Sequence, residues 1–191
     1  MERVAVVGSS GSGKSTLSRL LARRLDLRHV ELDAINHGPG WAPLAVPEFR
    51  RRVADELVHG RWVVDGNYRP VQDLGQGTAD TIVFLDLPRL LVTSRVARRS
   101  LRRVVTRQEL WNGNRETWRN ALSTDPERSV AAWTWQHHPR YRDLYLRSMT
   151  DGTWAHAEVV HLTSKREVRR FCRTLPHART RQASFSTNAS S

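Results

Sequence analysis

The stretch VAVVGSSGSGKST, residues 4–16, constrains the fold of this chain more than any other. Its first four residues are apolar and mostly β-branched, which is typical of a buried parallel strand. After it, leucines recur at helical spacing as far as Leu25, which indicates a helix of about a dozen residues. The sequence therefore predicts a strand, a loop of glycines and serines, and a helix in immediate succession.

The loop between these elements fits the pattern G-x-x-x-x-G-K-[ST] at every position. Small residues allow successive backbone N–H groups to converge on a polyphosphate, and the helix N-terminus adds partial positive charge. Lys14 is expected to reach the β- and γ-phosphates, and the Ser15 hydroxyl to ligate Mg²⁺. The loop thus predicts a site for ATP or another nucleoside triphosphate with Mg²⁺, bound by Gly8, Gly11, Ser12, Gly13, Lys14, Ser15 and Thr16.

Strand and helix patterns alternate along the rest of the chain. Further strands are predicted at 29–35, 61–66, 81–88 and 157–162, and further helices at 47–60, 89–105, 126–149 and after the capping box Ser164-x-x-Glu167. Residues 106–125 are polar and fit neither pattern. The alternation predicts an α/β fold of three layers, α/β/α, around a five-stranded parallel sheet. Segment 176–191 has the composition of a disordered tail.

Three aspartates, Asp33, Asp65 and Asp86, fall at or near the ends of predicted strands. Ligands of parallel sheets bind outside the carboxyl ends of the strands. Asp33 is expected to accept a proton from a substrate hydroxyl or to bind that hydroxyl, and the alternative is a helix or turn cap. Asp65 and Asp86 are competing candidates for the magnesium site.

Two segments carry a resemblance to a known family. VVDGNYR, residues 63–69, resembles the Asp-Gly-x-x-Arg element of adenylate kinase-like nucleotide kinases, and FLDLPRLLVTSRVARR, residues 84–99, resembles the strand, proline and arginine-bearing helix that follow it there. The resemblance covers most of residues 3–105 and, more weakly, the last strand and helix. By overall pattern (ELDAI, WVVDGNY, FLDLPR) the chain is most similar to the adenylate kinase-related NTPases called DNA topology modulation proteins.

This resemblance implies a P-loop NTPase fold of the nucleotide-kinase type. A single domain, 1–175, would contain an acceptor-binding segment at about 36–60 and a helical lid at about 95–150. Asp65, on a strand beside the loop, would position Mg²⁺ through water, which leaves Asp86 as structure.

The resemblance also implies roles for three arginines. Arg69 would hold a phosphate or another anion of the acceptor, Arg95 would lie over the donor base, and Arg99 would reach the transferring phosphoryl group. The alternative for Arg95 and Arg99 is a solvated helix face. That alternative stays fully open for Arg102, Arg103 and Arg107, which extend the stripe.

The chain departs from adenylate kinases after its second strand, where DAINHGPGWAP replaces their Thr-Gly-rich acceptor segment. AMP is therefore not the expected acceptor, and a hydroxyl-bearing small molecule or another nucleotide is. Trp41 either stacks on an acceptor ring or packs beneath its loop. The tryptophans at 111, 118, 133 and 135 either line a substrate cover or, as we expect, pack a helical subdomain.

The net charge of +12 is confined to two segments. Residues 1–86 hold 11 basic and 11 acidic side chains, whereas residues 87–147 hold 13 against 5 and residues 164–191 hold 7 against 1. A basic lid accounts for the first excess. The alternative is a nucleic-acid-associated NTPase in which 89–107 and 165–181 bind phosphate backbone, although the sequence contains no recognisable DNA-binding motif.

Other features narrow the functional class. The single cysteine, Cys172, excludes an internal disulfide, and no apolar run reaches membrane-spanning length. Without a signal-peptide pattern at its start, the chain is expected to be cytoplasmic. The sequence thus predicts a P-loop kinase that transfers the γ-phosphoryl group of ATP–Mg²⁺ to a small-molecule or nucleotide acceptor.

Overall fold

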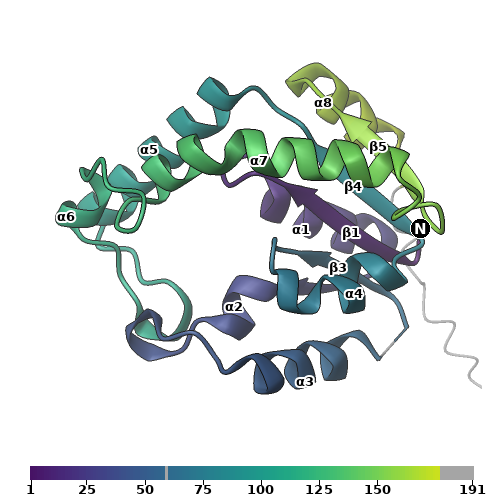
Figure 1. The fold of residues 1–191 in the computed structure, drawn as a ribbon, viewed down its shortest axis with the longest axis horizontal. Coiled ribbons are helices and arrows are strands. Elements are labelled where there is room, and N and C mark those ends of the chain that lie inside the picture. Colours follow the sequence, from purple (N-terminus) through teal and green to yellow (C-terminus); the bar gives the residue numbers. More distant parts are fainter. Residues whose placement is uncertain (59, 177–191) are drawn as a thin grey trace, which may run out of the picture.

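A computed structural model describes residues 1–58 and 60–176 of the chain. Within them, five parallel strands form a sheet in the order β2-β3-β1-β4-β5 (Figure 1). The strands are β1 Arg3–Gly8, β2 Arg28–Glu31, β3 Trp62–Asp65, β4 Thr81–Leu85 and β5 Glu158–Leu162. The principal helices are α1 Lys14–Leu25, α2 Leu32–Asn36, α3 Val46–Leu57, α4 Gln72–Gly75, α5 Arg89–Val105, α6 Trp118–Ala121, α7 Val130–Thr150 and α8 Lys165–Thr174.

Helices cover both faces of the sheet, as the alternation of strands and helices predicts. Successive side chains of a strand point to opposite faces. On β1, Ala5 and Val7 belong to a core shared with α3 and α7, whereas Val4 and Val6 belong to a core shared with α1 and α8. The three-layer α/β/α arrangement with its five-stranded parallel sheet is therefore confirmed.

β2 is shorter than predicted, and this moves Asp33. The strand ends at Glu31, where it pairs with Asp65 of β3, and the chain turns directly into α2. β2 is an edge strand, so it has β3 as its neighbour on one side only, and β3 ends at Asp65. Backbone groups beyond Glu31 have no strand to pair with and bond within a helix instead. Asp33 consequently lies in the first turn of α2 and not at a strand end.

The helix predictions hold for α3, α5 and α8, and the Ser164 side chain accepts a hydrogen bond from the Glu167 backbone N–H as the N-cap of α8. The polar region 106–125 contains two short helices, η4 Trp111–Gly113 and α6. No helix among the described residues combines the length and apolar character needed to cross a bilayer. The predicted tail lies outside the described residues except for Pro176.

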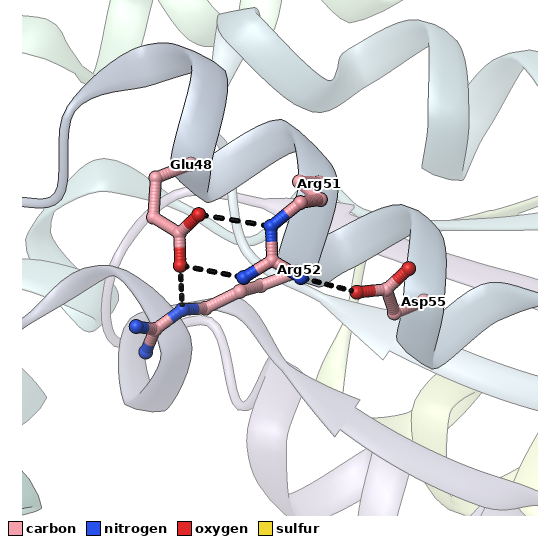
Figure 2. A network of polar contacts seen from close by, with 4 residues as sticks. All are labelled: Glu48, Arg51, Arg52 and Asp55. Carbon is pink, nitrogen blue, oxygen red and sulfur yellow. Dashed lines mark hydrogen bonds and ion pairs between the residues drawn. The ribbon is translucent and has the colours of Figure 1, made fainter.

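On the exposed side of α3, acidic side chains pair with neighbouring arginines (Figure 2). Glu48 accepts hydrogen bonds from Arg51 and Arg52 at 2.6 to 2.9 Å, and Arg51 also donates to Asp55 at 3.0 Å. Those bonds from the two arginines lower the pKa of Glu48 to about 2. The arginines of the expected acceptor segment are therefore largely compensated by neighbouring acids.

Candidate active site

The phosphate loop joins β1 to α1 in a conformation that requires its glycines. Gly8, Gly11 and Gly13 have φ angles of 140°, 78° and 102°, which other residues rarely adopt. A Cβ on Gly8 would lie 2.6 Å from the Leu85 carbonyl oxygen, and one on Gly11 would lie 2.4 Å from that of Val92. The loop is thus pressed against β4 and α5.

Lys14 lies inside this loop. Its Nζ donates to the carbonyl oxygens of Gly8 and Ser9 at 2.9 and 3.0 Å. The buried hydroxyls of Ser9 and Ser12 have no hydrogen-bond partner among the described residues. A half-buried ammonium beside hydroxyls that have no other partner is chemically suited to bind a polyphosphate anion.

Three other predicted site residues influence the pKa of Lys14. Burial lowers the pKa of Lys14 from 10.5 to about 8, the negative charges of Asp33 and Asp65 oppose that shift, and Arg99 adds to it. These three residues come from α2, β3 and α5. The fold therefore brings Lys14, Asp33, Asp65 and Arg99 together around the phosphate loop.

Asp65 ends β3 directly beside β1, where it pairs with Val6. The side chain is buried, and its Oδ2 has no hydrogen bond, with His29 Nε2 at 3.5 Å. Such a carboxylate oxygen suits a water molecule on a bound Mg²⁺. Within the described residues no cluster of three His, Cys, Asp or Glu side chains forms a self-contained metal site. These groups therefore fit Mg²⁺ that is held mainly by phosphate, water and Ser15.

Both carboxylate oxygens of Asp86, the competing candidate for the magnesium site, already have hydrogen-bond partners. It accepts hydrogen bonds from Arg142 Nε at 2.8 Å and from His161 Nε2 at 3.0 Å, and its side chain is 4% exposed. This network ties the end of β4 to α7 and β5. The geometry supports the prediction that Asp86 is structural.

Asp33 does not cap its helix. Glu31 is the N-cap residue of α2, and no side chain caps that terminus. The Asp33 Oδ1 atom instead accepts a hydrogen bond of 2.7 Å from the Tyr68 hydroxyl. The capping alternative is thus not what the structure shows, and the Asp33 carboxylate bonds instead to a side chain from the segment after β3.

The arginines from 95 to 107, on α5 and just after it, differ in their surroundings. Arg95 lies 3.4 and 3.5 Å from the carbonyl oxygens of Ser12 and Gly11, and Arg99 lies 3.4 Å from the Ser10 hydroxyl. Arg103 pairs with Glu116 at 2.8 Å. The exposed Arg98, Arg102 and Arg107 form no ion pair with a described acidic residue. The side of α5 that carries Arg95 and Arg99 therefore borders the phosphate loop.

Arg69 is the predicted site residue that the structure does not bring to Lys14. It is exposed in the short helix η2, Arg69–Val71, and its side chain forms no hydrogen bond or ion pair with the described residues. Its neighbours were missed by sequence reasoning although they share the VVDGNYR segment. Asn67 donates to the Gly8 carbonyl oxygen at 2.6 Å, and Tyr68 contacts Asp33.

A clasp, which we define as residues 111–114, joins the segment after α5 to the segment that follows α2 (Figure 1). Asn114 donates to the Gly38 carbonyl oxygen at 2.9 Å and accepts from the Trp41 backbone N–H at 2.9 Å. Trp111 stacks on His37 with 6.1 Å between ring centroids, and Trp41 packs edge-on against both rings. Trp41 thus packs within the chain itself, against Trp111 and His37.

The other tryptophans of this region divide as well. Trp133 stacks on His137, the Arg89 guanidinium lies 3.7 Å from the Trp135 ring centroid, and Trp118 is 54% exposed. Packing between side chains, which the sequence analysis favours for this region, accounts for Trp133 and Trp135. It does not account for Trp118.

Comparisons with known proteins support the fold. No protein-family model matches the sequence, and no curated protein matches it either. Among solved structures, the chain is similar to a shikimate kinase from Acinetobacter baumannii in complex with shikimate, with a TM-score of 0.53 and 17% sequence identity. The similarity covers 91% of this chain and 89% of that one. At that identity it shows the fold alone, which is the three-layer α/β/α arrangement around a five-stranded parallel sheet.

Proposed function

We propose that this chain is a cytoplasmic ATP-dependent P-loop kinase that phosphorylates a hydroxyl group of a small-molecule or nucleotide acceptor. One observation carries the proposal. The Lys14 ammonium lies inside the phosphate loop, Asp65 ends the neighbouring strand with Oδ2 unbonded, and Arg99 lies 3.4 Å from the Ser10 hydroxyl of the loop. The negative charge of Asp33 also opposes the effect of burial on the pKa of Lys14. A metal-positioning carboxylate, an acceptor carboxylate and a fixed cation around a triphosphate are the parts that phosphoryl transfer requires.

The donor site is assigned to the phosphate loop and α5. Gly8, Gly11, Ser12, Gly13, Lys14, Ser15 and Thr16 are proposed to hold the triphosphate, and Arg95 the base. Bound Mg²⁺ would neutralise the β- and γ-phosphate oxygens, with the Ser15 hydroxyl as a ligand and Asp65 acting through water.

The acceptor is assigned to Asp33, with Arg69 as a second contact through an anionic group. The acceptor oxygen forms a bond to the γ-phosphorus while the bond from that phosphorus to the bridging oxygen of ADP breaks. Asp33 accepts the hydroxyl proton, and Lys14 and Arg99 offset the charge on the transferring group. The similar fold that holds shikimate supports an acceptor of small-molecule size.

A screen of labelled γ-phosphate transfer over nucleosides, nucleotides and sugar-like acceptors tests the proposal. Lys14→Ala should abolish transfer, and Asp33→Asn should reduce it by at least about tenfold while ATP still binds. Transfer that survives Lys14→Ala would contradict the site assignment. Tyr145→Phe, a change in the core between Phe84 and Trp154, is the control.

One observation favours a second candidate, a nucleic-acid-associated NTPase of the DNA topology modulation type. α8 exposes five basic side chains that no described acid pairs with: Lys165, Arg166, Arg169, Arg170 and Arg173. Like charges at i, i+4 repel one another unless anions lie among them. Binding to duplex DNA that weakens steeply and linearly with the logarithm of salt concentration would support this candidate. Affinity no tighter than micromolar at physiological salt would remove it.

A further inference from the structure

Two side chains lie in line behind Asp33. The Tyr68 hydroxyl is 2.7 Å from Asp33 Oδ1 and 3.1 Å from His37 Nε2. Tyr68 comes from the segment after β3, whereas His37 follows α2. Three residues from two strand-end segments thus form a hydrogen-bonded chain that ends at the proposed acceptor carboxylate.

The number of hydrogens available determines which group donates in each of these two hydrogen bonds. The Tyr68 hydroxyl has one hydrogen, and an ionised carboxylate can only accept, so the hydrogen goes to Asp33. Burial, and then the charge of Asp33, raise the pKa of Tyr68 well above its usual range, so the hydroxyl keeps this hydrogen. His37 Nε2 must then carry its own hydrogen and donate it to the Tyr68 oxygen. Its other nitrogen, Nδ1, is buried without a partner among the described residues, which agrees with a ring unprotonated there.

Trp41 and the clasp hold the His37 ring in this orientation. Trp111 stacks on the ring, Trp41 packs edge-on against it, and the Asn112 side chain donates to the His37 carbonyl oxygen. In this hydrogen-bonded series, His37 is therefore held by clasp residues, and Asp33 lies at the opposite end.

We propose that Tyr68, held in place by His37, is a positioning residue: it occupies Asp33 Oδ1 and turns Oδ2 toward the acceptor hydroxyl. This inference rests on the proposed function, because it assigns Asp33 to the acceptor. It adds that the carboxylate is oriented through a tyrosine and a histidine that touch neither ATP nor the acceptor.

The ¹⁵N shifts of the His37 ring test the direction without any substrate. At about pH 8, where an ordinary histidine is neutral, the wild type should show one tautomer, protonated at Nε2. His37→Gln assigns the signals. A ring protonated at Nδ1, or an average of both tautomers, overturns the proposal, because Nε2 would then compete with Asp33 for the Tyr68 hydrogen.

A double-mutant cycle tests the role in transfer. Tyr68→Phe should lower kcat about tenfold and change the KM for ATP by less than about twofold, and the double variant with Asp33→Asn should be no slower than Asp33→Asn alone. His37→Gln, which keeps an N–H donor, should retain more activity than His37→Phe. Tyr145→Phe is the matched control, since the Tyr145 ring packs on Phe84 and Trp154 and its hydroxyl forms no hydrogen bond with the described residues.

The outcomes are separable. Single losses that multiply in the double variant, or a Tyr68→Phe enzyme equal to Tyr145→Phe, overturn the positioning role and leave the kinase intact. A wild type without transfer to any acceptor refutes the proposed function, and the positioning role falls with it. Circular dichroism of each variant separates loss of folding from loss of transfer.

Discussion

At the scale of single residues, the chemistry of this site is concentrated on Lys14. Its ammonium is held by carbonyl oxygens of its own loop, and burial brings its pKa to about 8. A half-buried cation with a pKa this close to neutrality is sensitive to an incoming anion.

Binding of ATP should therefore take up a proton at alkaline pH. Below about pH 8 Lys14 is charged before and after binding, whereas between about 8 and 10.5 the free lysine is neutral and the polyphosphate restores its charge. ATP affinity should fall as the pH rises through this window. Calorimetry at about pH 9 in buffers of different ionisation enthalpy measures the uptake. Lys14→Arg, which stays charged, should show much less, and equal values for both proteins would contradict the effect of burial.

Two glycines of the loop should differ in how much free energy of unfolding their replacement costs. At Gly13 an added Cβ meets no atom within 4 Å, so Gly13→Ala adds only the strain of a φ of 102°, about 1–2 kcal/mol. At Gly11 the Cβ would also lie 2.4 Å from the Val92 carbonyl oxygen, so Gly11→Ala should cost about 3 kcal/mol or more. Urea titrations of both variants provide the comparison, and similar losses would mean that α5 moves away at little cost.

Sequence reasoning succeeds at this scale where chemistry is local. The phosphate loop is one continuous pattern, and Ser164 and Glu167 are three positions apart. The Tyr68–Asp33 hydrogen bond spans 35 positions and the Asn114–Gly38 bond spans 76. Neither leaves a periodic signal, because each depends on how separate elements pack. Tyr68 could have been suspected from its place in VVDGNYR, whereas nothing local marks Asn114.

At the scale of elements, strand ends decide where the carboxylates lie. The sequence predicts strands ending near Asp33 and Asp65, and the second prediction holds. The first fails because pairing on β3 stops at Asp65, so β2 ends at Glu31, two positions before Asp33. This places Asp33 on α2, where Tyr68 can reach it.

The clasp makes a prediction at this scale. Asn114 is 5% exposed and bonds to Gly38, Trp41 and Trp111. Asn114→Ala should leave the partly buried Gly38 carbonyl and Trp41 N–H unsatisfied and release the clasp, at a cost of about 1–3 kcal/mol. Amide exchange should quicken in segments 37–42 and 109–116 and not in the phosphate loop. Asn120→Ala, at an exposed position of α6, is the control, and unchanged exchange in both segments would show that Asn114 does not hold the clasp.

At the scale of the whole molecule, the sheet order determines which groups meet. β1 lies between β3 and β4, so the phosphate loop, Asp65 and α5 converge at one edge of the sheet. The net charge of +12 is uneven, with the α5 arginines 95, 99 and 103 turned to the loop or to Glu116 and the α8 cations left exposed. The fold class was predictable from the alternation of strand and helix patterns. Which basic side chains face the loop and which stay exposed was not predictable.

The most direct measurement is a calorimetric titration of the chain with ATP, in the presence and absence of Mg²⁺, alongside Lys14→Ala. An ATP-dependent kinase with this site should bind ATP with a measurable heat, bind it more tightly with Mg²⁺, and lose most of that binding in Lys14→Ala. No heat from the wild type with ATP and Mg²⁺, or equal affinities of the wild type and Lys14→Ala, would contradict the assignment of the phosphate loop and of every residue grouped around it.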